Sequence, residues 1–142
     1  MENLSILRNF GILYRTFLNY VSKSITSKDL SFSDSVFLVN IGEKEGISQE
    51  EIASTLAIDK AAVARSVKSM EEKGFITSKK SASDKRAKEL YLSETGRELF
   101  QYILDLHEEW LKQLFQGKEA EEIQSFAKTI SDISERAKSI SK

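Results

Sequence analysis

The stretch that decides the fold is "GISQEEIASTLAIDKAAVARSVKSMEEKGFI", residues 46–76. Ser48 and Glu51 lie three positions apart, which is the spacing of a capping box. In that motif the serine hydroxyl accepts a hydrogen bond from a free amide at the helix start, and the glutamate reaches back to the capping residue. The spacing therefore predicts that a short helix begins here and runs over about 48–55.

A second helix, about 59–73, is predicted to follow after a tight turn. Asp59 is expected to cap it, because a carboxylate is favoured at the positive end of a helix. Its buried stripe consists of residues at helical spacing, namely Val63, Val67 and Met70. Gly74 suits the left-handed residue that ends a helix, and Phe75 then lies where a Schellman motif places its contact with Met70.

The opposite face of this second helix combines small and basic residues: Lys60, Ala61, Ala64, Arg65 and Lys68. An α-helix fits the major groove of B-DNA, and small side chains permit a close approach. Arg65 has the donors to bind guanine through two hydrogen bonds, whereas Lys60 and Lys68 suit phosphates. The alternative is an ordinary solvated helix face with no ligand.

Two strand-like runs come next, "FITSKK" at 75–80 and "KELYLS" at 88–93, and they predict a hairpin with a long basic tip. From Asp59 to Lys88 the net charge is +5, while the rest of the chain carries −6. Positive charge is therefore concentrated in one part of a chain whose total charge is −1. Two short helices followed by a basic hairpin indicate a winged helix-turn-helix.

Long amphipathic helices are predicted on both sides of this core. The first, Ile6–Ile25, has apolar residues at helical spacing, and Ser31 or Ser33 can cap a short apolar helix after it. Ser93 is expected to cap a long helix that Gly117 breaks before the last helix. The apolar stripes of the three long helices are Leu7, Phe10, Tyr14, Phe17 and Val21; Leu99, Phe100, Ile103, His107, Trp110 and Leu114; and Ile123, Phe126, Ile130, Ile133, Ala137 and Ile140.

Composition excludes several classes of site. The chain has 142 residues, no cysteine and a single histidine, His107, so disulfides, thiolate metal sites and multi-histidine sites are not available to it. No nucleophile–base pair or glycine-rich phosphate loop is present, so we expect no enzyme, no metal and no cofactor. The lack of a signal-like start and of a long apolar run favours a cytoplasmic protein.

The chain resembles the MarR family of winged helix-turn-helix transcriptional regulators over roughly residues 30–100. The resemblance is carried by the quoted stretch, by Asp84-x-Arg86 in the hairpin tip, and by Leu92-Ser93-x-x-Gly96. It implies a mainly α fold with a small β-hairpin in a single chain, 1–142. The expected parts are an N-terminal dimerisation helix (1–30), a DNA-binding lobe (31–92) and C-terminal dimerisation helices (93–142).

The resemblance also implies that Arg86 enters the minor groove and that Asp84 holds the wing tip in shape. Narrow minor grooves concentrate negative potential, which attracts arginine. The alternative is a plain surface ion pair of little energetic value. The family commonly has arginine at the position of Ser78, so a wing-base salt bridge is not expected here. The predicted DNA-binding residues are Ser48, Lys60, Ala61, Ala64, Arg65, Lys68, Lys79, Lys80, Asp84, Lys85 and Arg86.

Many members of the family bind a small aromatic or anionic effector in a crevice between the dimerisation helices and the DNA-binding lobe. The resemblance predicts such a site from the aromatic side chains of the long helices. The candidate lining residues are Phe10, Tyr14, Phe17, Phe37, His107 and Trp110. Ordinary core and interface packing is the alternative for each of them.

Together with the basic helix face and hairpin, the resemblance thus implies a homodimeric regulator that binds double-stranded DNA at a palindromic operator, and a repressor that a small molecule releases. The alternative is a winged-helix protein-interaction module that does not read DNA. Burial of Arg65, Lys68 and Arg86 in protein contacts would favour that alternative. The sequence does not distinguish repression from activation.

Overall fold

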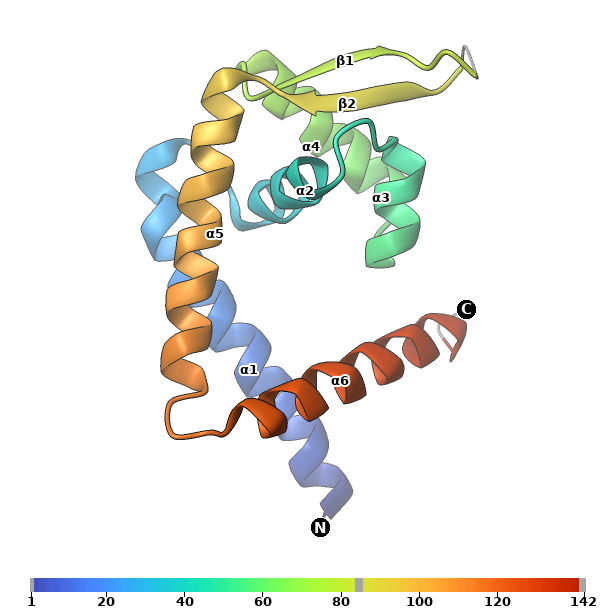
Figure 1. The fold of residues 1–142 in the computed structure, drawn as a ribbon. Coiled ribbons are helices and arrows are strands. Elements are labelled where there is room, and N and C mark those ends of the chain that lie inside the picture. Colours follow the sequence, from blue (N-terminus) through green and yellow to red (C-terminus); the bar gives the residue numbers. More distant parts are fainter. Residues whose placement is uncertain (1, 84–85, 141–142) are drawn as a thin grey trace. The chain divides into compact units, whose positions relative to one another are not determined.

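The computed structural model describes residues 2–83 and 86–140, and Figure 1 shows the fold. The predicted order of helices and hairpin is confirmed, with one short 3-10 turn added after the first helix. The elements are α1 (Glu2–Ile25), η1 (Thr26–Lys28), α2 (Phe32–Glu43), α3 (Gln49–Leu56), α4 (Lys60–Glu72), β1 (Ile76–Lys80), β2 (Lys88–Leu92), α5 (Glu94–Leu114) and α6 (Ala120–Ile140). The fold is a winged helix-turn-helix with long flanking helices.

The chain divides into two compact units, 1–108 and 109–142, and each is described by itself. In the first unit α2 lies in the middle and packs against α1, α3, α4 and β2 (Figure 1). The core combines buried residues from all of these elements, among them Val21, Ile25, Leu38, Ile41, Ile52, Val63, Val67, Met70, Leu90 and Ile103. Removing this apolar surface from water is the main force that holds the short helices in place.

Three serines cap helices by accepting hydrogen bonds from backbone amides. Ser31 Oγ accepts from the amide of Asp34 at 3.0 Å, and Ser93 Oγ accepts from Gly96 at 3.0 Å. Ser48 Oγ accepts from Glu51 at 3.1 Å, and Glu51 Oε1 accepts from the Ser48 amide at 3.5 Å, which confirms the capping box. The choice between Ser31 and Ser33 is therefore resolved in favour of Ser31.

The prediction that Asp59 is the N-cap of α4 is confirmed, but without the expected side-chain hydrogen bond. Asp59 occupies the N-cap position of α4, but its side chain makes no capping hydrogen bond. Its backbone carbonyl instead accepts from the amides of Ala62 at 3.1 Å and Val63 at 3.2 Å. The carboxylate itself is exposed.

The end of α4 is a Schellman motif, as the glycine predicted. The Phe75 amide donates to the Met70 carbonyl at 2.9 Å, and the Gly74 amide donates to the Glu71 carbonyl at 3.0 Å. Gly74 has φ of 82°, a left-handed conformation that costs glycine little. This turn directs the chain from α4 straight into β1.

The hairpin is a two-stranded antiparallel sheet whose register runs from the pair Ile76–Leu92 to the pair Lys80–Lys88. The connection before α3 adds to its other edge. The Gly46 amide donates to the Leu90 carbonyl at 2.8 Å, and the Leu90 amide donates to the Ile47 carbonyl at 3.0 Å. The wing is therefore tied by backbone hydrogen bonds to the segment that starts the helix-turn-helix.

The second unit contains the end of α5, a turn and α6. Gly117 has φ of 84° and breaks the helical run, as predicted. Beside the turn, the rings of Phe115 and Phe126 pack edge to face with centroids 5.8 Å apart. None of the described residues of α6 is buried, and its exposed apolar side chains include Phe126, Ile130, Ile133 and Ile140.

Exposed apolar side chains also cover much of α1, including Leu4, Ile6, Leu7, Phe10, Ile12 and Tyr14. Such density of exposed apolar surface is typical of helices that pack against another chain. Among the described residues, no helix is both long and apolar enough to cross a membrane.

Candidate nucleic-acid interface

The outer face of α4 is arranged as its periodicity predicted. Val63, Ser66, Val67 and Met70 are buried against the core. The small and basic residues of the opposite face are all exposed: Lys60, Ala61, Ala64, Arg65 and Lys68. This face therefore offers donors over a surface low enough for a close approach to base edges.

Polar contacts fix α4 at several points along its length. In its middle, the buried Ser66 hydroxyl donates to Asp34 Oδ1 on α2. At its end, Lys73 Nζ donates to the Asp29 carbonyl at 2.8 Å. Helix α4 is therefore held by contacts on both α2 and the segment before it, which the sequence pattern did not indicate.

Ser78 takes up the wing-base position where the family commonly has arginine. Its hydroxyl donates to Glu71 Oε2 at 2.9 Å, so β1 is hydrogen-bonded to the last turn of α4. A hydrogen bond from a hydroxyl to a carboxylate, and not a salt bridge, thus links wing and helix at this place. This contact is exposed and contributes only modestly to stability.

The two lysines of β1, Lys79 and Lys80, are both exposed. Lys79 Nζ lies 4.8 Å from the centre of the Tyr91 ring, a cation–π contact across the hairpin. The Tyr91 hydroxyl donates to Glu89 Oε1 at 2.7 Å, and this hydrogen bond raises the pKa of Tyr91. Lys79 is thereby held on one face of the wing.

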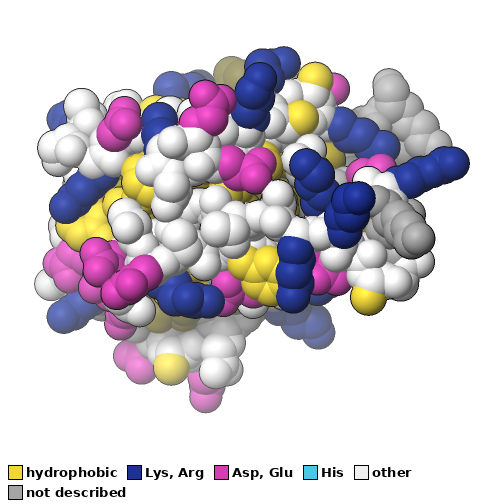
Figure 2. Space-filling model, turned by 90° about the horizontal axis from the view of Figure 1, so that it is seen from above, with side chains coloured by type: hydrophobic (Ala, Val, Ile, Leu, Met, Phe, Trp, Pro, Cys, Tyr) yellow, Lys and Arg dark blue, Asp and Glu magenta, His cyan; other side chains and the backbone are white. Residues whose placement is uncertain are grey.

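Ser48 and Arg86 lie on opposite sides of one groove of about 530 Å³ between the start of α3 and the wing. The other lining residues are Gln49, Glu50, Ala87 and Lys88. Figure 2 looks onto the side of the molecule that carries the hairpin. Several Lys and Arg side chains lie there toward the far end of the hairpin. Asp84 and Lys85 lie outside the described residues.

Glu51 of the capping box is also paired with Lys44. Lys44 Nζ donates to Glu51 Oε2 at 2.7 Å, and this hydrogen bond is the main reason that the pKa of Glu51 is lowered. The carboxylate therefore stays ionised and keeps its place at the start of α3, beside the groove that contains Ser48.

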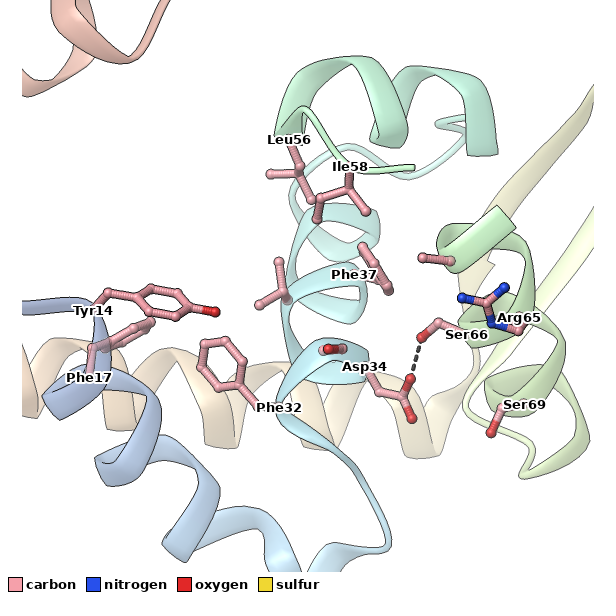
Figure 3. A pocket seen from close by; sticks show the side chains of 13 residues that line it. Tyr14, Phe17, Phe32, Asp34, Phe37, Leu56, Ile58, Arg65, Ser66 and Ser69 are labelled. Atoms are coloured by element: carbon pink, nitrogen blue, oxygen red, sulfur yellow. Dashed lines mark hydrogen bonds between the residues drawn. The ribbon is translucent and has the colours of Figure 1, made fainter. Parts of the chain in front are cut away.

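A second cavity, of about 610 Å³, lies among α1, α2 and α4 (Figure 3). It contains three of the candidate effector residues, Tyr14, Phe17 and Phe37. The sequence analysis missed most of its lining: Phe32, Ser33, Asp34, Val36, Leu56, Ile58, Ala62, Arg65, Ser66 and Ser69. The only local signal was the acidic residue Asp34 inside an apolar helix.

The other three candidate effector residues lie elsewhere. Phe10 is exposed on α1, and Trp110 is half-buried in the second unit. His107 is half-buried and packs on Phe17, with ring centroids 5.3 Å apart. Burial lowers the pKa of His107, because it disfavours the charged imidazolium.

Among residues 2–83 and 86–140, no group of three or more His, Asp or Glu side chains is placed to hold a metal ion. The arrangement of described side chains is instead that of a binding surface. It combines a basic helix face, a basic hairpin and an apolar cavity that reaches the inner side of the same helix.

Comparison with known proteins gives a consistent set of relatives. The family model described as "MarR family" matches residues 21–88. The chain is 30% identical over 95 residues to the HTH-type transcriptional regulator YybA of Bacillus subtilis, an alignment that spans 67% of this chain and 63% of that protein. It is 29% identical over 111 residues to the HTH-type transcriptional regulator BilQ of Clostridium symbiosum, which spans 78% of this chain and 77% of that protein.

Solved structures show the same similarity. A crystal structure of the transcriptional regulator SlyA matches with a TM-score of 0.86 and 28% identity, over 94% of each chain. A MarR family transcriptional regulator from Listeria monocytogenes, crystallised with a 26-mer DNA, matches with a TM-score of 0.89 and 26% identity. That match covers 94% of this chain and 89% of the Listeria chain.

Proposed function

The chain belongs to the MarR family of transcriptional regulators, and from this premise we propose that it is a homodimeric repressor. It binds a palindromic operator in double-stranded DNA and leaves the operator when a small molecule binds. The observation that carries this proposal is the exposed face of α4, where two alanines lie among Lys60, Arg65 and Lys68. The Listeria relative, whose structure contains a 26-mer DNA, supports it.

In this proposal α4 lies in the major groove. Arg65 binds a guanine edge through two hydrogen bonds, and Lys60 and Lys68 neutralise phosphates on either side. Ala61 and Ala64 keep the helix surface low between them, so that the helix axis comes close to the bases.

The wing contacts the neighbouring part of the duplex. Arg86 enters the minor groove, where narrow A·T-rich sequences concentrate negative potential. Lys79, Lys80 and Ser48 contact the DNA backbone. The two lysines do so from β1, and Ser48 from the start of α3. Asp84 and Lys85 are assigned to the wing tip by the family resemblance alone.

A dimer supplies the second half-site. The exposed apolar residues of α1 and α6 become buried between two copies, which is the fate of such surfaces in stable assemblies. Two copies of α4 then lie about one helical turn of DNA apart, near 34–36 Å. In this reading, residues 1–30 and 93–142 form the dimerisation part and residues 31–92 the DNA-binding lobe.

The cavity beside α4 is the proposed effector site. An occupant there touches Ala62, Arg65, Ser66 and Ser69 on α4, together with aromatic residues of α1 and α2. A ligand that favours a different position of α4 shifts the population of dimers away from the DNA-binding spacing. A regulator that binds chromosomal DNA works in the compartment that contains the chromosome. The cytoplasmic location expected from the sequence remains a prediction.

The protein-interaction alternative required Arg65, Lys68 and Arg86 to be buried in protein contacts. All three side chains are exposed in the chain, which favours the DNA-binding proposal.

The test is fluorescence anisotropy on duplex DNA from upstream of the gene, with a scrambled duplex as control and a salt series for both. Tight binding to the upstream duplex with a steep negative salt slope supports the proposal. Absence of binding to either duplex at low salt would contradict it and favour the interaction module.

A further inference from the structure

Asp34 is the buried acid of the cavity among α1, α2 and α4. Its side chain is 8% exposed and lines the cavity. Oδ1 accepts the Ser66 hydroxyl, and among the described residues Oδ2 has no hydrogen-bond partner. No fully buried side-chain oxygen is left without a partner in the described chain, so Oδ2 is accessible from the cavity. A carboxylate oxygen without a partner in such a place calls for a hydrogen-bond donor.

Aromatic rings form the opposite wall. Phe32 packs edge to face with Tyr14, at 6.3 Å between centroids, and with Phe17, at 5.8 Å. Figure 3 shows these three rings on one side, with Asp34 and Ser66 beyond them toward α4. The volume of about 610 Å³ lies in the range of small-molecule sites. The faces of such rings attract cations as well as other rings.

The two charged lining residues differ in their contact with water. Arg65 is exposed, so solvent screens its attraction for an anion. Asp34 is buried, so its attraction for a cation acts through a medium of lower dielectric. An anion in the same cavity would also be repelled by that carboxylate. Arg65 repels a cation through water, but the buried Asp34 acts more strongly on a ligand's charge, so the lining favours a cation over an anion.

We infer that this cavity binds a compact aromatic amine, with the ammonium group on Asp34 and the ring among Tyr14, Phe17 and Phe32. The inference deepens the effector step of the proposed function and rests on it for its regulatory meaning. It reverses the charge of the aromatic anion that the family resemblance implied.

The same contact links the ligand to DNA binding. The Ser66–Asp34 hydrogen bond joins α4 to α2. An ammonium group bound to Asp34 competes with the Ser66 hydroxyl for the carboxylate. Occupancy therefore loosens the support of the recognition helix and brings the ligand beside Arg65.

The experiment is calorimetric titration of the full chain with three probes of nearly equal shape: 2-phenylethylamine, 2-phenylethanol and phenylacetate. At neutral pH the amine is a cation, the alcohol neutral and the acid an anion. We expect the amine to bind roughly tenfold more tightly than the alcohol, as a charge-assisted hydrogen bond provides, and phenylacetate to bind most weakly.

The variant Asp34→Asn keeps the shape and the acceptor for Ser66 but removes the charge. It is expected to bring the amine and the alcohol to similar affinities. Asp29→Asn is the matched control, because Asp29 is exposed, lies outside the cavity and has a left-handed backbone that asparagine tolerates. Thermal unfolding establishes that both variants fold. If Asp34→Asn fails to fold, Ser66→Ala replaces it, and the freed carboxylate should keep or increase the preference for the amine.

Three results would overturn the inference: phenylacetate binding as tightly as the amine, none of the probes binding at millimolar concentration, or an amine preference that Asp34→Asn leaves unchanged. The titrations contain no DNA, so they are independent of operator binding. An amine preference that depends on Asp34 in a protein without operator binding would refute the proposed function and leave the ligand assignment intact. Operator binding without an amine preference would refute the ligand assignment alone.

Discussion

In the proposed function, Arg65 is the residue at which DNA reading and ligand binding meet. Its guanidinium belongs to the exposed face of α4, and its side chain also lines the cavity beneath. The planar group can bind a guanine edge through two hydrogen bonds, which a lysine cannot reproduce. A single side chain thus connects the proposed DNA-reading surface with the proposed effector cavity.

Replacing Arg65 by alanine is expected to reduce the discrimination between operator and scrambled DNA by about 1–3 kcal/mol, because a base contact is lost. Anisotropy titrations on the two duplexes measure it. Lys68→Ala is the matched control and should weaken both duplexes alike, since a phosphate contact carries no sequence information. Equal losses on both duplexes for Arg65→Ala would reassign this residue to the backbone.

Replacing Arg86 by alanine is expected to weaken binding to most sequences and to reduce the slope of log K against log salt by about 1. Without the Arg86 guanidinium the protein neutralises one phosphate charge fewer. Fewer counterions are then released on binding, and the slope becomes less steep. A salt series on the operator measures the slope. A slope equal to that of the unmodified protein would contradict a groove or phosphate role for Arg86.

His107 gives the chain a pH dependence near neutrality. Its pKa is lowered in the folded protein because the half-buried ring loses hydration. As the pH falls, His107 is therefore protonated in the unfolded chain before it is protonated in the folded chain. The free energy of unfolding then decreases as the pH drops through about 6.5. His107→Gln should flatten that part of the curve in urea unfolding measured from neutral to mildly acidic pH. An unchanged profile would show that the ring does not contribute.

At the scale of elements, the junction between the wing and α5 depends on a close approach. A Cβ on Gly96 would lie 2.0 Å from the Phe75 carbonyl oxygen, which is backbone and cannot turn aside. The same carbonyl accepts the Ser93 amide at 3.0 Å, so the start of α5 is fixed to the turn that ends α4. Glycine is required here for space.

Gly96→Ala is expected to destabilise the fold by about 1–3 kcal/mol, the usual cost of overpacking. Urea unfolding followed by circular dichroism measures the change. Thr95→Ala, at the exposed neighbouring position, is the control and should change stability by less than about 0.5 kcal/mol. Equal stability of the two variants would show that the backbone moves freely at this junction.

Local signals account for the elements that could be predicted from the sequence. The capping box at Ser48 and the left-handed Gly74 act within a few residues, so their spacing alone determined where α3 begins and α4 ends. The contacts that hold the elements together are not local. Ser66 reaches Asp34 across 32 positions, and Arg97 reaches Glu45 across 52. No periodicity encodes such pairs, and this is why most of the cavity lining was missed.

At the scale of the whole molecule, the proposal requires two chains. Ile133 is 45% exposed on α6, in a row of apolar residues that water does not favour. An isolated copy would present one recognition helix to the DNA, whereas a palindrome needs two at a fixed spacing.

Ile133→Glu is expected to shift the protein from dimer to monomer, because a charge at an apolar interface must be buried without a partner. Size-exclusion chromatography with light scattering measures the mass. Thr129→Glu, on the same helix at an exposed polar position, is the control and should remain dimeric. A dimer that survives Ile133→Glu would remove α6 from the proposed interface.

The most direct test of the central claim is hydroxyl-radical footprinting of the bound operator. The account predicts two symmetric protected half-sites with centres about 10–10.5 base pairs apart, flanked by minor-groove protection. In Arg86→Ala the half-sites should remain and the flanking protection should disappear. A single asymmetric protected segment, or flanking protection that Arg86→Ala leaves unchanged, would contradict a dimer that reads DNA with α4 and the wing.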